Sequence, residues 1–167
     1  MIQRAMVFLL ASALPFVAQQ PFAPQTEADA PVQPVPYSHR VHVALGLPCA
    51  ACHENPDPGE AMGLPKPGGC MSCHRRVKSE SPHIQRLAKA AAENQPLKWK
   101  RVYQVPGYVF FSHRMHLEAG SQCQDCHGPV ATRDVLWKEG DISMGGCMAC
   151  HEQKKAANGC NTCHEPR

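Results

Sequence analysis

One pattern decides the fold, and it occurs twice in the chain. Residues 37–53 read Y-S-H-R-V-H-V-A-L-G-L-P-C-A-A-C-H, and residues 111–127 read F-S-H-R-M-H-L-E-A-G-S-Q-C-Q-D-C-H. The two align without a gap. Further along, residues 68–74 (G-G-C-M-S-C-H) match residues 145–151 (G-G-C-M-A-C-H) at all positions but one. An internal duplication explains both similarities.

Every cysteine of the chain belongs to a C-x-x-C-H motif, and there are five such motifs among 10 cysteines. This is the attachment signature of c-type haem. Two thiols at that spacing reach the two vinyl groups of one porphyrin, and the next residue places an imidazole on the iron as proximal ligand. The sequence therefore predicts five haem c groups, numbered here as motifs 1 to 5: Cys49, Cys52 and His53; Cys70, Cys73 and His74; Cys123, Cys126 and His127; Cys147, Cys150 and His151; Cys160, Cys163 and His164.

Zinc sites and disulfide bridges are the alternatives for so many cysteines. Paired C-x-x-C motifs also build zinc sites, and a cysteine-rich exported chain is often crosslinked by disulfides. Neither chemistry requires a histidine directly after every second cysteine. The repeated histidine therefore favours haem.

The composition offers little material for a core of side chains. The chain has 16 Pro and 12 Gly but only 5 Phe, 3 Tyr and 2 Trp. Small chains with a weak core need metals, disulfides or partners. We expect a mainly α-helical fold with much irregular loop and little or no sheet, at most a small hairpin within residues 102–111. The interior would be filled by haem.

The chain divides into five predicted segments. Residues 1–23 contain an apolar run that is shorter than the roughly 20 residues of a membrane span, which predicts a secretory signal peptide or an N-terminal anchor and export to the periplasm. Residues 24–36 read as a flexible Pro-rich linker. Residues 37–78 would form a dihaem half, residues 79–110 a linker helix and extended segment, and residues 111–167 a trihaem domain. In the linker, Ser81 and Pro82 can start a helix, with Ile84, Leu87, Ala88 and Ala91 on one face.

Five of the 10 histidines lie outside the motifs and are candidates for the sixth, distal iron ligand. His39 and His42 are three positions apart, as are His113 and His116. On a helical turn this spacing places both rings on one side, where each can ligate a different iron. We predict all four as distal ligands.

The fifth distal ligand has two candidates. Met144 lies in the half that carries the extra motif, whereas His83 lies in the linker helix and has no counterpart in the duplication. We favour Met144, which would raise the potential of its haem relative to neighbours with two histidine ligands. His83 and an open coordination site are the alternatives.

The S-H-x-x-H frame before C-x-x-C-H resembles the class III cytochromes c, the cytochrome c3 and c7 types. In that group the first histidine serves the adjacent haem and the second serves the next one. The resemblance implies that His39 serves motif 1, His42 motif 2, His113 motif 3 and His116 motif 4. Residues 143–146 (S-M-G-G) depart from the c7 pattern, in which a histidine before the second motif ligates the last haem.

A second resemblance covers nearly all of the chain after the predicted signal. The order of S-H-x-x-H, two motifs, S-P-x-I-x-x-L, W-x-R-V, V-P-G-Y-V-F-F-S-H and three further motifs is similar to the pentahaem cytochrome subunit of alternative complex III. It implies electron relay from a membrane quinol-oxidising complex to other redox proteins, with no small-molecule substrate. A diffusing c7-type shuttle is the runner-up, and a multihaem reductase would need an iron with an open face.

The charge pattern adds one feature. Residues 75–101 carry eight basic side chains and two acidic ones. These side chains can pair with haem propionates or dock an acidic surface. We expect no binding of nucleic acid by an exported haem protein.

Overall fold

The computed structural model describes residues 22–23, 25–55 and 59–165. The predicted signal peptide or anchor at residues 1–23 therefore lies almost wholly outside the described residues. No helix within the described ranges is long and apolar enough to cross a membrane.

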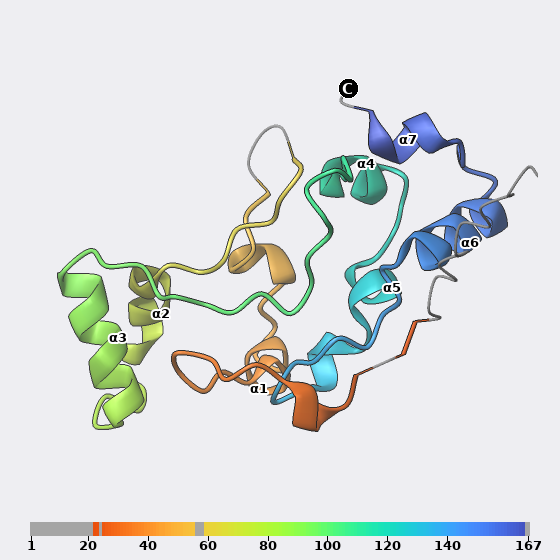
Figure 1. Ribbon diagram of the computed structural model, residues 1–167. Coiled ribbons are helices and arrows are strands. Elements are labelled where there is room, and N and C mark those ends of the chain that lie inside the picture. The colour runs from red at the N-terminus through yellow and green to blue at the C-terminus, as the bar shows by residue number, and fades with distance from the viewer. Residues whose placement is uncertain (1–21, 24, 56–58, 166–167) are drawn as a thin grey trace, which may run out of the picture.

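The described part of the chain is helical and irregular, and no strand occurs in it, which confirms the predicted fold class. The helices are α1 (His39–Val43), α2 (Pro67–His74), α3 (Pro82–Ala92), α4 (His113–Glu118), α5 (Cys123–His127), α6 (Met144–Lys154) and α7 (Cys160–His164), with 3-10 turns η1 (Glu27–Asp29), η2 (Cys49–Ala51) and η3 (Val130–Thr132) (Figure 1). The hairpin allowed for residues 102–111 does not form. Short turns close there instead, in which the Val109 amide donates to Pro106 O at 2.9 Å and the Phe111 amide donates to Val109 O at 3.2 Å.

Serine caps start the two helices that carry the paired histidines. The Ser38 hydroxyl accepts from the amide of Val41 at 3.1 Å in α1, and the Ser112 hydroxyl accepts from the amide of Met115 at 3.3 Å in α4. Each cap satisfies an amide that has no partner within its helix. The S-H-R-x-H frame thus encodes its own helix start, and both histidines follow within the first turns.

The main hydrophobic cluster lies between α2 and α3. Its buried members are Val35, Met71, Ile84 and Leu87, with Leu97 and Trp99 among the residues packed against it. The predicted apolar face of the linker helix is confirmed, because Ile84 and Leu87 are buried and Ala88 and Ala91 pack beside them. The helix ends at Ala92, and Asn94 follows with a left-handed φ of 51°.

Residues 25–36 pack against the body of the protein, which differs from the flexible linker expected. Val35 is 3% exposed. The Gln25 amide donates to Lys138 O at 3.1 Å, and the Arg86 guanidinium donates to Pro34 O at 2.8 Å. Prolines fix the backbone of this segment at low entropic cost, so a Pro-rich composition is compatible with an ordered strap as well as with a linker.

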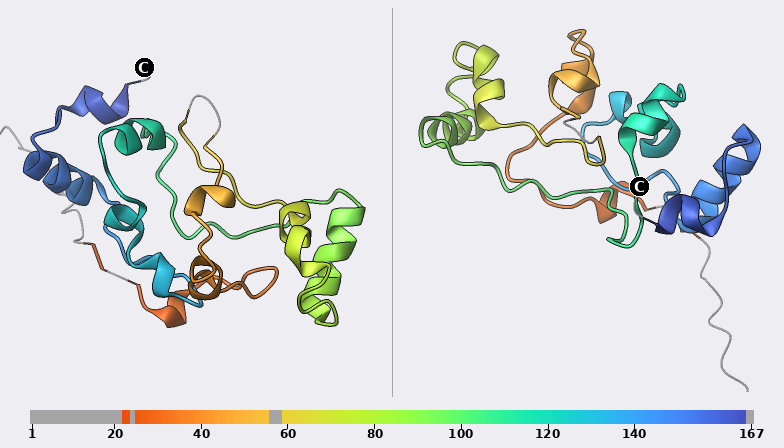
Figure 2. Two further views of the ribbon diagram at one scale, coloured as in Figure 1. Left: turned by 180° about the vertical axis from the view of Figure 1, so that it is seen from behind. Right: turned by 90° about the horizontal axis from the view of Figure 1, so that it is seen from above.

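The helices are arranged along one long direction. Figures 1 and 2 show α2 and α3 at one end of the molecule and α6 and α7 at the other. Helices α1, α4 and α5 lie between them. The five motifs are therefore spread along the molecule rather than gathered at one place.

Candidate haem-binding sites

Each predicted distal histidine faces the proximal histidine of a different motif. The ring centroids of His39 and His53 are 6.4 Å apart, and those of His113 and His127 are also 6.4 Å apart. The pair of His42 and His74 is separated by 6.1 Å, and the pair of His116 and His151 by 6.0 Å. These are the four pairs that the c7 resemblance implies, although their ligation to iron remains a prediction.

The separation of each pair fits one iron atom held between two imidazoles. A histidine nitrogen lies about 2 Å from the metal that it binds. A five-membered ring with bonds of about 1.33 Å has its centre about 1.1 Å from each atom. Two rings on opposite sides of one metal should therefore have centres about 6.3 Å apart. The four measured distances, 6.0 to 6.4 Å, agree with this value.

Most of these histidines are also oriented for ligation. Six of the eight paired histidines, and His164 of motif 5, donate a hydrogen bond from Nδ1 to a backbone carbonyl, which leaves Nε2 as the free ligand atom. The Nδ1–O distances are 2.8 Å for His42, 3.0 Å for His53, 2.9 Å for His74, 2.8 Å for His113, 2.8 Å for His116, 2.6 Å for His151 and 3.2 Å for His164. Metal-binding histidines almost always donate their second nitrogen in this way.

His39 departs from the arrangement of its duplicate. Its Nδ1 is buried and has no hydrogen-bond partner, whereas Nδ1 of the aligned His113 donates to Glu60 O. Burial, together with the neighbouring His53 and His42 rings, lowers the pKa of His39 to about 4. A neutral imidazole is the form that binds a metal. His39 thus lacks the carbonyl acceptor that orients its duplicate, and the stacking contacts of its ring orient it instead.

Two aromatic residues hold the distal rings, and the sequence reasoning missed them. Tyr37 stacks on His42 at 4.4 Å and contacts His39 edge-on at 4.8 Å. Phe111 does the same to His116 at 4.5 Å and to His113 at 4.7 Å. The signal was present, because both aromatics stand at the first position of the duplicated pattern. They fix the ring planes on which ligation would depend.

Comparison with known families agrees with this geometry. Residues 109–165 match the family model of cytochrome c7 and related cytochrome c. Residues 109–165 are a cytochrome c7-like multihaem domain. The comparison with curated proteins found no match. The match thus identifies a multihaem c-type cytochrome domain in this chain, and this class implies electron transfer and haem c as the cofactor.

Within the cytochrome c7-like domain, motif 5 lacks a facing histidine among the described residues. The ring of His164 lies 6.0 Å from that of Tyr108, and its Nδ1 donates to the Tyr108 carbonyl. Met144 is the first residue of α6, is half-exposed, and lies on the helix that precedes α7. His83 is exposed on α3, at the opposite end of the molecule from α7 (Figures 1 and 2). The structure therefore places His83 away from motif 5 and Met144 on the helix next to it along the chain.

The cysteines lie as single thiols, and all ten are free. No group of three or more His, Cys, Asp or Glu side chains in the described ranges converges as a metal-binding cluster would. The paired histidines with nearby thiols match the donor set of a haem c site, which takes one imidazole on each face of the porphyrin and two thioether bonds at its edge. When bound, haem supplies a reversible one-electron change at its iron.

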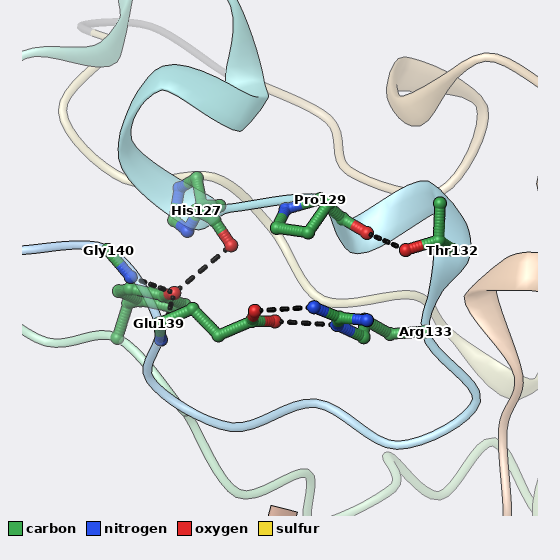
Figure 3. A network of polar contacts seen from close by, with 7 residues as sticks. His127, Pro129, Thr132, Arg133, Glu139 and Gly140 are labelled. Atoms are coloured by element: carbon green, nitrogen blue, oxygen red, sulfur yellow. Dashed lines mark hydrogen bonds and ion pairs between the residues drawn. The ribbon is translucent and has the colours of Figure 1, made fainter. Parts of the chain in front are cut away.

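A network of hydrogen bonds holds the backbone of motif 3 in the cytochrome c7-like domain. The Tyr103 hydroxyl donates to His127 O at 3.1 Å and accepts from the amides of Glu139 and Gly140 at 2.9 and 3.0 Å. Arg133 donates two hydrogen bonds to the Glu139 carboxylate at 2.8 and 2.7 Å (Figure 3). These hydrogen bonds lower the pKa of Glu139. The network fixes the backbone that carries the proximal histidine.

Proposed function

We propose that this chain is a pentahaem c-type cytochrome that relays electrons and does not itself transform a substrate. The observation that carries the proposal is the set of four histidine pairs at 6.0 to 6.4 Å, each beside a C-x-x-C-H motif. Two imidazoles on one iron leave no open position for a substrate, which favours electron transfer over catalysis. The fifth C-x-x-C-H motif, with His164 anchored to a backbone carbonyl, supports a fifth haem.

Mass and colour test this proposal directly. The exported protein, purified from a host with a c-type haem maturation system, should weigh as much as its polypeptide plus five haems and should absorb as low-spin haem. A protein that carries no haem would overturn the proposal. A mass that corresponds to four haems would limit the proposal to motifs 1 to 4.

We propose Met144 as the distal ligand at motif 5. It lies on α6, next to α7 along the chain, whereas His83 lies on α3 at the other end of the molecule (Figure 1). Met144→Leu should abolish the near-infrared band of methionine-ligated ferric haem and lower one of the five potentials. His83→Ala should leave both unchanged. The opposite result would assign the ligand to His83, and a high-spin ferric signal in the wild type would indicate an open iron and reopen the reductase alternative.

We propose that the chain works in the periplasm, bound to a membrane quinol-oxidising complex similar to alternative complex III. The support is the order of motifs and intervening segments, which extends from the first S-H-x-x-H to the last C-x-x-C-H. The chain should co-purify with membranes from its native cells after detergent extraction, together with quinol-oxidising subunits. Recovery of all of it in the periplasmic fraction as a free monomer would instead favour the diffusing c7-type shuttle.

A further inference from the structure

The two halves of the duplication dock on each other reciprocally. The amide of Arg40, in the S-H-R-x-H frame of the first half, donates to Arg133 O at 2.9 Å. The amide of Arg114, at the aligned position of the second half, donates to Gly59 O at 3.1 Å. Gly59 belongs to the loop that follows motif 1, and Arg133 to the loop that follows motif 3. Each half therefore forms a backbone hydrogen bond to the loop that follows the first motif of the other half.

Further hydrogen bonds reinforce these two contacts between the halves. The Arg40 side chain donates to the Asp134 carboxylate, with Nε at 3.1 Å, and the Ser38 hydroxyl donates to the same carboxylate. On the other side, His113 Nδ1 donates to Glu60 O at 2.8 Å. Gly59 has a φ of +90°, and a Cβ there would lie 2.6 Å from Cβ of Arg114, so this close approach needs glycine.

These hydrogen bonds between the halves bring motif 1 and motif 3 together. The thiols of Cys49 and Cys123 lie beside each other, so that burial first and the Cys49 thiol next raise the pKa of Cys123. Two motifs separated by a whole half of the chain are thus neighbours in space.

The remaining motifs extend outward from this junction. Helix α1 presents His39 to His53 of motif 1 and His42 to His74 of motif 2, so motif 2 lies beyond motif 1. Helix α4 relates motif 3 to motif 4 in the same way, through the rings of His127 and His151.

Motif 5 lies at the far end, next to motif 4. Helix α7, which carries motif 5, follows α6, which carries motif 4, and both helices lie at the same end of the molecule. Figures 1 and 2 agree with the resulting order, since α2 lies at one end of the molecule and α7 near the other.

We propose that the five motifs form a row in the order 2, 1, 3, 4, 5, which is not their order in the sequence. Motifs 1 and 3 are the only link between the halves in this row. The end positions, where a partner protein can exchange electrons with one haem without passing the others, are then motif 2, beside α3, and motif 5, on α7. This inference rests on the proposed function, because it concerns the haems that the motifs would bind.

Removing one haem at a time tests the order. The charge of an oxidised haem raises the midpoint potential of its close neighbours, so the loss of a haem shifts only the haems beside it. The variant C70A/C73A, which lacks motif 2, should shift the potential of one remaining haem, that of motif 1. The variant C49A/C52A should shift two, those of motifs 2 and 3. The measurement is a redox titration followed by NMR of the assigned haem methyl signals.

A row in sequence order reverses both numbers. C70A/C73A would then shift two haems, including that of motif 3, and C49A/C52A would shift one, and this pattern would overturn the inference. Where a cysteine variant does not fold, H42M replaces C70A/C73A and H39M replaces C49A/C52A. Each of these variants keeps its haem but changes the potential of that haem, and the same number of neighbouring haems should shift. Mass spectrometry separates the two proposals, because a wild-type chain without haem contradicts the proposed function, whereas a loaded chain with the wrong neighbours contradicts only the order.

Discussion

Gly69 and Gly146 occupy the same position in the duplicated G-G-C motif, but the structure gives them different surroundings. A Cβ at Gly146 would lie 2.5 Å from both Cγ and the backbone O of Asp141, and 2.8 Å from its Oδ1. A Cβ at Gly69 would have no neighbour within 4 Å. Both glycines lie in helices, α6 and α2. The two Gly→Ala variants are therefore matched in sequence context and differ in contacts.

The size of the effect follows from this difference. Alanine in a helix is favoured over glycine by about 1 kcal/mol, and that gain is common to both variants. At Gly146 the added methyl meets a backbone carbonyl that cannot rotate away, and overpacking of this kind costs about 1–3 kcal/mol. Gly69→Ala should therefore raise the free energy of unfolding by up to about 1 kcal/mol. The free energy of unfolding of Gly146→Ala should be lower than that of Gly69→Ala by about 1–3 kcal/mol.

Denaturant unfolding of the haem-loaded protein measures this difference. The covalent haems stay attached, and their absorption reports the loss of histidine ligation as the chain unfolds. Both variants should keep five haems by mass, so that only stability is compared. Equal denaturation midpoints for the two variants, or a more stable Gly146→Ala, would show that Asp141 does not crowd the start of α6 and would refute the reasoning.

Three further outcomes are expected. Tyr103→Phe leaves the amides of Glu139 and Gly140 without their acceptor and should lower the free energy of unfolding by about 1–3 kcal/mol. Denaturant titration measures this change, and an unchanged midpoint would contradict a stabilising role of the network. Hydrogen bonds from Arg40 and Ser38 lower the pKa of Asp134, so this carboxylate stabilises the fold above its unfolded pKa of about 3.9 and loses that effect as the pH falls through the folded value. The stability difference between wild type and Asp134→Asn should therefore be constant near neutral pH and vanish in acid, and a difference that persists in acid would count against the pair. The facing rings are parallel within 6° at motifs 1 and 3 but tilted by 51° and 45° at motifs 2 and 4. Ferric electron paramagnetic resonance should therefore resolve two classes among the four haems with two histidine ligands, and one uniform class among them would show that the imidazole planes rearrange around iron.

The features that the sequence predicted are those fixed by short spacing. C-x-x-C-H and S-H-x-x-H each fit within a turn or two of helix, so the local backbone alone brings their side chains to one side. The linker helix was predictable for the same reason, because Ile84 and Leu87 repeat at helical spacing.

What the sequence did not reveal depends on contacts between distant segments. The row order of the motifs is set by hydrogen bonds such as that from Arg40 to Arg133, which join the two halves and have no signature in either one. The docking of residues 25–36 was missed because their composition is equally typical of a linker, and only the packing of Val35 in the hydrophobic cluster between α2 and α3 distinguishes the two. The hairpin at residues 102–111 fails because Tyr103 is engaged by His127, Glu139 and Gly140 rather than by a partner strand.

The fold of this chain and the binding of its cofactor are a single energetic problem. The described residues bury four hydrophobic side chains, while large apolar residues such as Leu45 and Tyr108 remain 71% and 68% exposed. The helices α1, α5 and α7 are five residues long, far below the length at which a helix is stable in water. An iron held between His42 and His74, or between His116 and His151, would crosslink segments that side-chain packing alone does not unite, and metal affinity then contributes directly to folding. A chain that gains its stability from its cofactors needs only local motifs to place each one, and this explains why a pattern of cysteines and histidines predicts so much of a protein with so small a core.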